Sequence, residues 1–217
     1  MSADTSACQT ETDTPLGRML FARNGQGLCG LWFEGQKYHP GALAVPRRDQ
    51  DPLLRQAVAA VQAYFAGQPF VPPPLSVAGT PFQQAVWSAL LQIPTGVTCS
   101  YGDLATRLGR PEAVRAVAAA VGRNPLSLLV PCHRVMGANG QLTGYAGGLE
   151  RKRALLALEA RLKATAFTLS SPSPAAAVPP ATALATTRGA AKPAPDTSRR
   201  PVGATDLATS PLQGAGA

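Results

Sequence analysis

The chain has 217 residues, of which 45% are hydrophobic and 15% charged, so it is long enough for one or two compact domains with a buried core. No apolar run approaches the roughly 18 residues that a membrane span needs. The polar N-terminal segment, with Asp4, Glu11 and Asp13, does not resemble a signal peptide. Four cysteines are too few for a disulfide scaffold. These features exclude a membrane protein and a disulfide-rich secreted protein, and they favour a reduced, cytoplasmic one.

The net charge of +8 is unevenly distributed along the chain. Residues 1–81 hold six basic and six acidic residues, residues 82–164 hold ten and four, and residues 165–217 hold four and two. The middle block is therefore the part that would attract a polyanion such as nucleic acid. Charge alone supports that partner only weakly, because many protein surfaces are this basic.

Residues 1–33 predict a flexible leader followed by a hairpin. The leader covers residues 1–14, and two short strands cover residues 16–23 and 28–33. Between the strands, Asn24-Gly25 supplies the positive φ values that a tight turn favours. We therefore expect a small antiparallel sheet at the start of the chain.

A helix is expected next, and it closes the first domain. Asp51 suits the N-cap, Pro52 suits the first helical position, and Gly67 suits the C-terminal end. The apolar stripe at three- and four-residue spacing consists of Leu54, Val58, Val61 and Phe65. Because a proline-rich connector follows, we place the first domain at residues 1–79 and the second at residues 80–164.

The second domain is expected to be mainly helical. One helix begins after the N-cap Thr80, and two short helices cover residues 100–108 and 110–122. The two short helices, joined by a tight glycine-containing turn, form a helix-turn-helix pattern, which many unrelated helical pairs also match. A final amphipathic helix spans residues 149–163. Beyond it, Ala, Pro, Thr and Ser supply 35 of the last 53 residues, so we expect residues 165–217 to be a disordered tail.

The segment VPCHRV, residues 130–135, carries the candidate chemistry. A cysteine is a nucleophile only as its thiolate, so Cys132 needs a group that lowers its pKa or takes its proton. His133 follows directly, Arg134 adds positive charge, and Glu159 on the last helix is a candidate to orient the histidine. Taken alone, the pair is better explained by a buried cysteine beside a hydrogen-bonded histidine, because free cysteine is usually a core residue.

The surrounding segments decide between these interpretations. They occur in the order Tyr101-Gly102-Asp103-Leu104-Ala105, Arg115-Ala116-Val117, Asn124-Pro125, Pro131-Cys132-His133-Arg134-Val135 and Gly144-Tyr145-Ala146-Gly147-Gly148. Together they resemble the O6-alkylguanine-DNA alkyltransferases, also called methylated-DNA–protein-cysteine methyltransferases, densely over residues 80–161 and more loosely before them. The resemblance implies an α/β protein with a small ribonuclease-H-like sheet-plus-helix domain, then a mainly helical domain with a helix-turn-helix.

The resemblance also implies the chemistry, which is single-use transfer of an alkyl group from guanine O6, or thymine O4, to Cys132. His133 would take the thiol proton through a water, and Glu159 would hold the imidazole, as in a hydrolase triad. The sulfur would lie deprotonated at the mouth of a cleft. No step regenerates the thiol, because a thioether offers water no good leaving group. Each molecule would act once as a methyltransferase and would need no cofactor.

The implied partner is double-stranded DNA that contains the alkylated base, which must be flipped out of the stack. Arg115 matches the residue that fills the gap, and Tyr101 matches the one that crowds the target phosphate and hydrogen-bonds the base. The helix that carries Arg115 would enter the minor groove, which favours backbone contact over sequence readout. Asn124, which matches a structural asparagine, and Lys152 complete the expected DNA-binding group.

The base pocket is expected to read guanine mainly through the backbone. The carbonyls of Cys132 and Val135 would accept from the exocyclic amine, and the N–H of Ala146 would contact O6. Tyr145 and Val121 are expected to form part of the pocket wall. Ser127 and Thr143 are expected to set the width of the pocket. At position 118 the chain departs from the pattern, with Ala118 where glycine is frequent.

No metal is expected, since Cys8, Cys29 and His39 are scattered and make a weak tetrahedral site. Cys99 is expected to be a buried strand residue, and the protein is expected to be a monomer. Two other classes of function stay open: a non-catalytic protein that binds the alkyl lesion and a helix-turn-helix regulator. An acceptor cysteine argues against the first, and a recognition helix with few polar side chains argues against the second. A cysteine hydrolase is a third, weaker alternative.

Overall fold

The computed structural model describes residues 7–170, with side chains to residue 164. No helix within that range is long and apolar enough to cross a membrane. The expected tail falls largely beyond the described residues, but its first six residues do not match the prediction. The last helix, α5 (Leu149–Ser170), continues through them.

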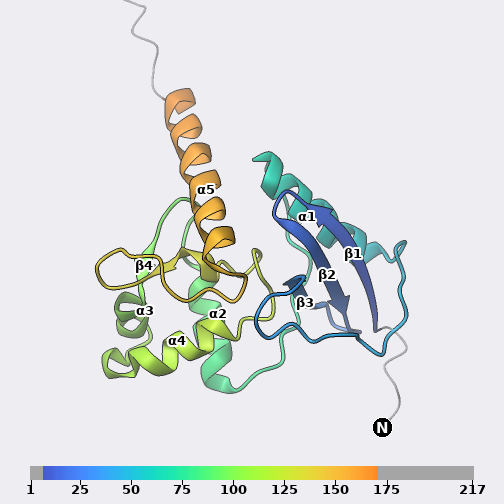
Figure 1. Ribbon diagram of the computed structural model, residues 1–217, viewed down its shortest axis with the longest axis horizontal. Helices are drawn as coiled ribbons and strands as arrows, with labels where there is room; N and C mark the ends of the chain where they lie inside the picture. The colour runs from blue at the N-terminus through green and yellow to red at the C-terminus, as the bar shows by residue number, and fades with distance from the viewer. Residues whose placement is uncertain (1–6, 171–217) are drawn as a thin grey trace, which may run out of the picture. The chain divides into compact units, whose positions relative to one another are not determined.

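Three antiparallel strands and one helix form the first part of the fold (Figure 1). The strands are β1 (Cys8–Thr14), β2 (Gly17–Arg23) and β3 (Leu28–Phe33), in the order β1-β2-β3. The flexible leader was therefore the wrong prediction for residues 8–14, which pair with β2 from Cys8↔Arg23 to Thr14↔Gly17. This strand has a weak apolar pattern, since most of its side chains are polar, and its pairing partner rather than its own composition defines it.

The β2–β3 connection does not use the expected positive-φ turn. Positive φ occurs at eleven of the described residues, and neither Asn24 nor Gly25 is one of them. Instead, the Asn24 side-chain carbonyl accepts hydrogen bonds from the N–H groups of Gln26 and Gly27, at 2.9 and 3.0 Å. Asparagine thus closes the turn with its side chain, as in an Asx turn.

Helix α1 (Pro52–Ala66) packs against β1 and β2. Its N-cap is Asp51, whose carboxylate accepts the N–H groups of residues 53 and 54 and pairs with Arg23 at 3.2 Å. Gly67 ends the helix in the left-handed conformation, at φ 68°. The buried face is rotated from the predicted stripe, since it includes Tyr64 whereas Phe65 is only half-buried.

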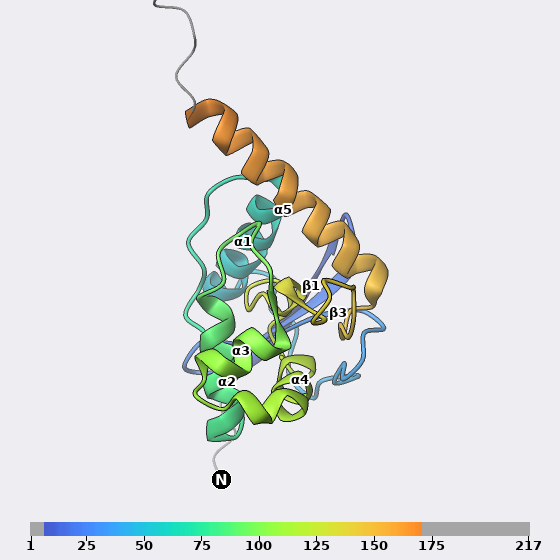
Figure 2. The ribbon, with the colours of Figure 1, turned by 90° about the vertical axis from the view of Figure 1, so that its left-hand side faces the viewer.

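The helical part contains α2 (Pro81–Leu91), α3 (Tyr101–Arg107), the 3₁₀ turn η1 (Pro111–Ala113) and α4 (Val114–Gly122). Capping boxes start α2 at the predicted N-cap Thr80 and α3 at Ser100. The indole N–H of Trp87 on α2 donates to the Ala120 carbonyl on α4 at 2.9 Å. Figure 2 shows α2, α3 and α4 gathered as one group. Of these, α3 and α4 form the predicted helix-turn-helix.

A short two-stranded parallel sheet joins β4 (Cys99–Ser100) to β5 (Val135–Met136), directly after the 3₁₀ turn η2 (Cys132–Arg134). Cys99 is buried in this sheet, as predicted. The loop after α4 also pairs with β3, because the Leu31 N–H donates to the Pro125 carbonyl at 2.8 Å. These backbone pairings fix the turn that carries Cys132 between the sheet and the helices.

Candidate active site

Cys132 opens the turn η2 and is only 3% exposed. Its Sγ accepts a hydrogen bond from the Asn124 Nδ2 at 3.1 Å. Burial raises the pKa of the Cys132 thiol, and the Asn124 hydrogen bond lowers it only in part. The sulfur is therefore enclosed and does not lie at the mouth of a cleft, so that part of the prediction was wrong, and its burial opposes the deprotonated form.

Asn124 ties the end of α4 to this turn. Besides the sulfur, its Nδ2 donates to the Val130 carbonyl at 2.9 Å, and its side-chain carbonyl accepts the Leu126 N–H at 3.0 Å. With 4% exposure, the side chain faces the interior and has no access to DNA. Asn124 therefore has the structural role that the family resemblance implies. Its assignment to the DNA-binding residues was wrong.

His133 and Glu159 form a fully buried pair behind the cysteine. The Nε2 of His133 lies 2.9 Å from Oε1 of Glu159, which reaches the turn from α5. Burial lowers the pKa of His133, although Glu159 opposes that shift. Burial would raise the pKa of Glu159, but hydrogen bonds from His133 and Arg134 hold it well below its usual range. An ionised Glu159 can only accept, so Nε2 carries the proton and Nδ1 has a free lone pair.

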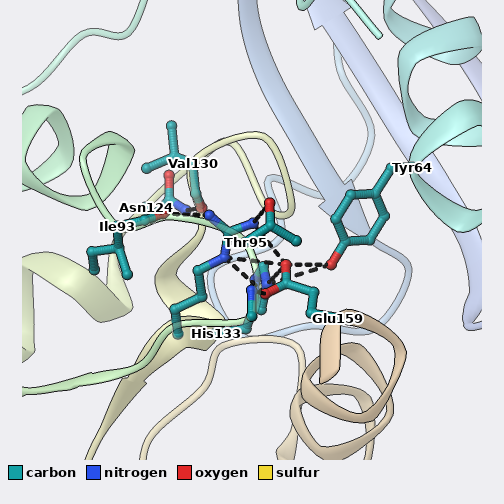
Figure 3. Close-up of polar contacts among 9 residues, drawn as sticks. Tyr64, Ile93, Thr95, Asn124, Val130, His133 and Glu159 are labelled. Carbon is teal, nitrogen blue, oxygen red and sulfur yellow. Dashed lines mark hydrogen bonds and ion pairs between the residues drawn. The ribbon is translucent and has the colours of Figure 1, made fainter. Parts of the chain in front are cut away.

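Two further side chains bind Glu159, and the sequence assigned neither of them a role there (Figure 3). Arg134 donates to both carboxylate oxygens, with Nη2 at 2.7 Å from Oε1 and Nε at 2.9 Å from Oε2. Tyr64, from α1, donates its hydroxyl to Oε1 at 2.8 Å. Because Arg134 directly follows His133 in the sequence, its contact with Glu159 could have been anticipated. The contact between Tyr64 and Glu159 joins residues that are 95 positions apart, so no local sequence pattern could reveal it.

A cavity of about 460 Å³ lies near the turn η2, between helix α4 and the glycine-rich loop of residues 144–148. Tyr101 lines it and donates its hydroxyl to the Gly144 carbonyl at 3.0 Å. Gly144 has a φ of 44°, and a Cβ there would lie 3.1 Å from that hydroxyl, so glycine suits the position. The other lining residues are Lys37, Tyr38, Ala118, Ala119, Gly122, Thr143, Tyr145 and Ala146.

The cavity thus brings together several residues expected at the base pocket, namely Tyr101, Thr143, Tyr145 and Ala146. The Tyr145 ring also packs edge-on to His133, with centroids 6.4 Å apart, which places the cavity wall against the His133–Glu159 pair. Lys37 and Tyr38 are additions from the first part of the chain. Their loop is anchored because the Lys37 N–H donates to the Ala146 carbonyl at 2.9 Å.

Other expected pocket residues lie in the interior. The side chain of Val121 packs in the hydrophobic core and does not line the cavity, so this prediction was wrong. Val135 is fully buried, and its carbonyl accepts from the Lys152 ammonium at 2.5 Å. Ser127 is also buried, with its hydroxyl donating to Gln36 at 3.0 Å. None of these three residues lines the cavity.

Lys152 does not reach the surface. Its side chain is fully buried, and its ammonium donates to the carbonyls of Val135 and Thr143 at 2.5 and 2.6 Å. Burial lowers the pKa of Lys152 to about 8. A DNA phosphate cannot reach this group, so its assignment to DNA binding was wrong. Arg115, in contrast, is exposed on the first turn of α4.

The described residues contain no cluster of three or more His, Cys, Asp and Glu side chains that could hold a metal ion. None of the four cysteines, all of which lie within the described residues, forms a disulfide. Cys8 is a buried residue of β1, not part of a leader, and it packs in the hydrophobic core.

The turn that carries Cys132, with the His133–Glu159 pair behind it, follows a helix-turn-helix in the chain, and this arrangement is compatible with thiol chemistry on a nucleic acid. Two family models match the chain: "6-O-methylguanine DNA methyltransferase, ribonuclease-like domain" over residues 9–71 and "6-O-methylguanine DNA methyltransferase, DNA binding domain" over residues 81–161. The chain belongs to this family. The match confirms both the family resemblance and the fold class that the sequence predicts.

Similar proteins agree. The chain is 45% identical over 159 residues to a methylated-DNA–protein-cysteine methyltransferase of Mycobacterium leprae, covering 72% of the chain and 94% of that protein. It is 42% identical over 157 residues to the Haemophilus influenzae protein of that name, covering 71% and 87%. A crystal structure of Mycobacterium tuberculosis OGT in complex with DNA matches with a TM-score of 0.65 and 44% identity, covering 71% and 94%.

Proposed function

We propose that this protein repairs alkylated DNA directly, by moving the alkyl group from O6 of guanine to the sulfur of Cys132. Membership of the 6-O-methylguanine DNA methyltransferase family supports the reaction. The observation that best supports Cys132 as acceptor is the histidine next to it. Glu159 holds one ring nitrogen of His133, and the other, Nδ1, is buried without a hydrogen-bond partner among the described residues.

The reaction balances without a cofactor. Nδ1 of His133 takes the thiol proton, directly or through one water, as Sγ attacks the alkyl carbon. A C–S bond forms while the bond from carbon to O6 breaks, and its electron pair stays on guanine. The proton then passes to the guanine anion, which restores the normal base. The thioether persists, so each molecule acts once; thymine O4 offers the same chemistry.

Duplex DNA is the substrate, and the alkylated base must leave the stack to reach the cavity. The exposed Arg115 on α4 fills the gap that the base leaves, while Tyr101 and Tyr145 wall the base. The net charge of +6 in residues 82–164, from ten basic and four acidic residues, attracts the phosphates. We place this activity in the cytoplasm, where four free cysteines remain reduced.

Intact-mass spectrometry after incubation with a methylated duplex tests the proposal. We expect a gain of one methyl group, mapped to Cys132, and none in Cys132→Ala. The matched control is Cys99→Ala, which removes another buried thiol and retains methyl transfer. Methyl on another residue would refute the acceptor. Product in excess of protein would instead indicate a hydrolase, and binding without transfer would indicate a lesion-binding protein.

A further inference from the structure

Tyr64 connects the ribonuclease-like part of the chain to the catalytic pair. It lies on α1, within the residues that match that domain, and is 6% exposed. Its hydroxyl donates to Oε1 of Glu159 at 2.8 Å and lies 3.5 Å from Nε2 of His133 (Figure 3). A buried hydroxyl that contacts both Glu159 and His133 can affect the hydrogen bond between them.

The donors around Glu159 define what Tyr64 can do. Oε1 accepts from Tyr64, His133 and Arg134, while Oε2 accepts from Arg134 and from the Gly96 N–H at 3.0 Å. Burial raises the pKa of Tyr64 far above its ordinary value, and the negative charge of Glu159 adds to this shift. Tyr64 therefore keeps its proton and acts as a donor at any working pH.

We propose that Tyr64 is a positioning residue for alkyl transfer, which fixes Glu159 against Nε2 of His133 and so leaves Nδ1 free to take a proton. This inference rests on the proposed function, because it assigns the proton of Cys132 to that nitrogen. The hydroxyl reduces the charge density on Oε1, and the carboxylate therefore stabilises the neutral, correctly oriented imidazole without binding the imidazolium too tightly. The ribonuclease-like part of the chain thereby contributes to the reaction.

Other charged and titratable groups face His133 from every element packed against it. They are Glu159 and Lys152 on α5, Arg134 and Cys132 in η2, Tyr64 on α1 and Tyr145 in the glycine-rich loop. Arg134 and Lys152 favour the neutral ring, and Glu159 favours the charged ring. Among these groups Tyr64 is the one that belongs to the first part of the chain.

Tyr64→Phe isolates the hydroxyl, because the ring keeps its edge-on contacts with Phe65 and Phe70. We expect single-turnover methyl transfer to slow about tenfold at neutral pH, the size of one lost hydrogen bond to a charged group. We also expect the acidic limb of the pH–rate profile to move to higher pH, because Glu159 with one donor fewer holds the imidazolium more tightly. The control Phe70→Leu removes ring packing and leaves the profile unchanged.

Nitrogen-15 NMR of the imidazole in the full chain supplies a readout independent of transfer. In the unsubstituted protein we expect a protonated Nε2 and an unprotonated Nδ1, and in Tyr64→Phe a higher pKa for the His133 ring. The opposite tautomer, or a rate, profile and ring pKa unchanged by Tyr64→Phe, would overturn the role of Tyr64. If the unsubstituted protein gained no methyl on Cys132, the proposed function would fail instead, and the NMR comparison would still decide the role of Tyr64.

Discussion

The enclosure of the Cys132 sulfur is the main correction at the scale of single residues. A sequence shows that His133 and Arg134 flank Cys132, and positive neighbours favour a thiolate. It does not show that both neighbours are already engaged by Glu159, nor that the sulfur is 3% exposed. Burial raises the pKa of the thiol, and for this reason the proposed mechanism assigns its proton to His133.

Asn124 provides a test of how the sulfur is held. In Asn124→Ala, the Val130 carbonyl and the Cys132 sulfur lose their shared donor, so we expect a loss of about 1–3 kcal/mol in the free energy of unfolding. Methyl transfer should also slow, because the turn is no longer fixed to the end of α4. Denaturant unfolding and single-turnover assays measure the two effects. Asn139→Ala, at an exposed asparagine, is the control, and equal behaviour of the two variants would contradict this account.

Lys152 separates a structural role from DNA contact. Lys152→Met leaves the carbonyls of Val135 and Thr143 without their donor, and we expect a stability loss of about 1–3 kcal/mol. The salt dependence of DNA affinity should stay unchanged, because the buried ammonium reaches no phosphate. Thermal unfolding and binding titrations measure these quantities. A reduced salt slope with unchanged stability would show that the side chain contacts DNA after all.

At the scale of elements, α4 presents a surface suited to close approach rather than to base readout. Its exposed positions include Val114, Arg115, Ala116 and Ala119, so one long cation stands among small side chains. Ala118 lines the cavity, where its methyl group narrows the space beside Gly122. The helix therefore offers one residue that can enter the base stack and little that can distinguish sequences.

Arg115→Ala tests that role. We expect repair of a methylated duplex to slow by at least about tenfold, since the gap left by the flipped base is no longer filled. Transfer from a free alkylguanine should change little, because no stack has to be opened. The ratio of the two single-turnover rates is the measurement, and Arg55→Ala, at an exposed arginine of α1, is the control. Equal slowing with both substrates would reject a role in base flipping.

Local signals explain which elements the sequence could predict. The N-caps Asp51, Thr80 and Ser100 act within three residues of themselves, and the helices they start were predicted. Strand β1 depends on pairing with β2, and its polar residues carry no local sign of that pairing. The same limit applies to the site. The VPCHRV motif identified His133, and the last predicted helix offered Glu159 as its partner, whereas the contact of Tyr64 with Glu159 spans 95 residues and depends on the packed fold.

At the scale of the whole molecule, the uneven charge predicts how DNA binding responds to salt. Residues 82–164 carry ten of the 20 basic residues and only four of the 12 acidic ones. Affinity for undamaged duplex should fall steeply as salt rises, with a slope of about 0.9 in log–log form for each phosphate neutralised. Arg115→Ala should reduce that slope by up to about one unit. Fluorescence anisotropy over a salt series measures it, and a flat response would contradict binding through this part of the chain.

Acid should destabilise the whole fold through the buried pair at its centre. The pKa of Glu159 is held well below its ordinary value of 4.5, and burial lowers the pKa of His133 from 6.5. Below each ordinary value the unfolded chain binds more protons than the folded one, so the free energy of unfolding falls as pH falls. The contribution of His133 starts to decline below about pH 6.5. That of Glu159 is complete above about pH 4.5 and is lost as pH falls below that value.

Glu159→Gln tests this assignment, because it removes the titrating carboxylate while keeping the side-chain shape. At neutral pH we expect a less stable protein, since His133 and Arg134 lose their anionic partner. Below pH 5 we expect a flatter dependence of unfolding free energy on pH than in the unsubstituted chain. Urea unfolding, followed by the fluorescence of the two tryptophans at a series of pH values, measures both. If the free energy of unfolding of the variant kept its full dependence on pH, Glu159 would not contribute to that dependence, and other carboxylates would have to cause it.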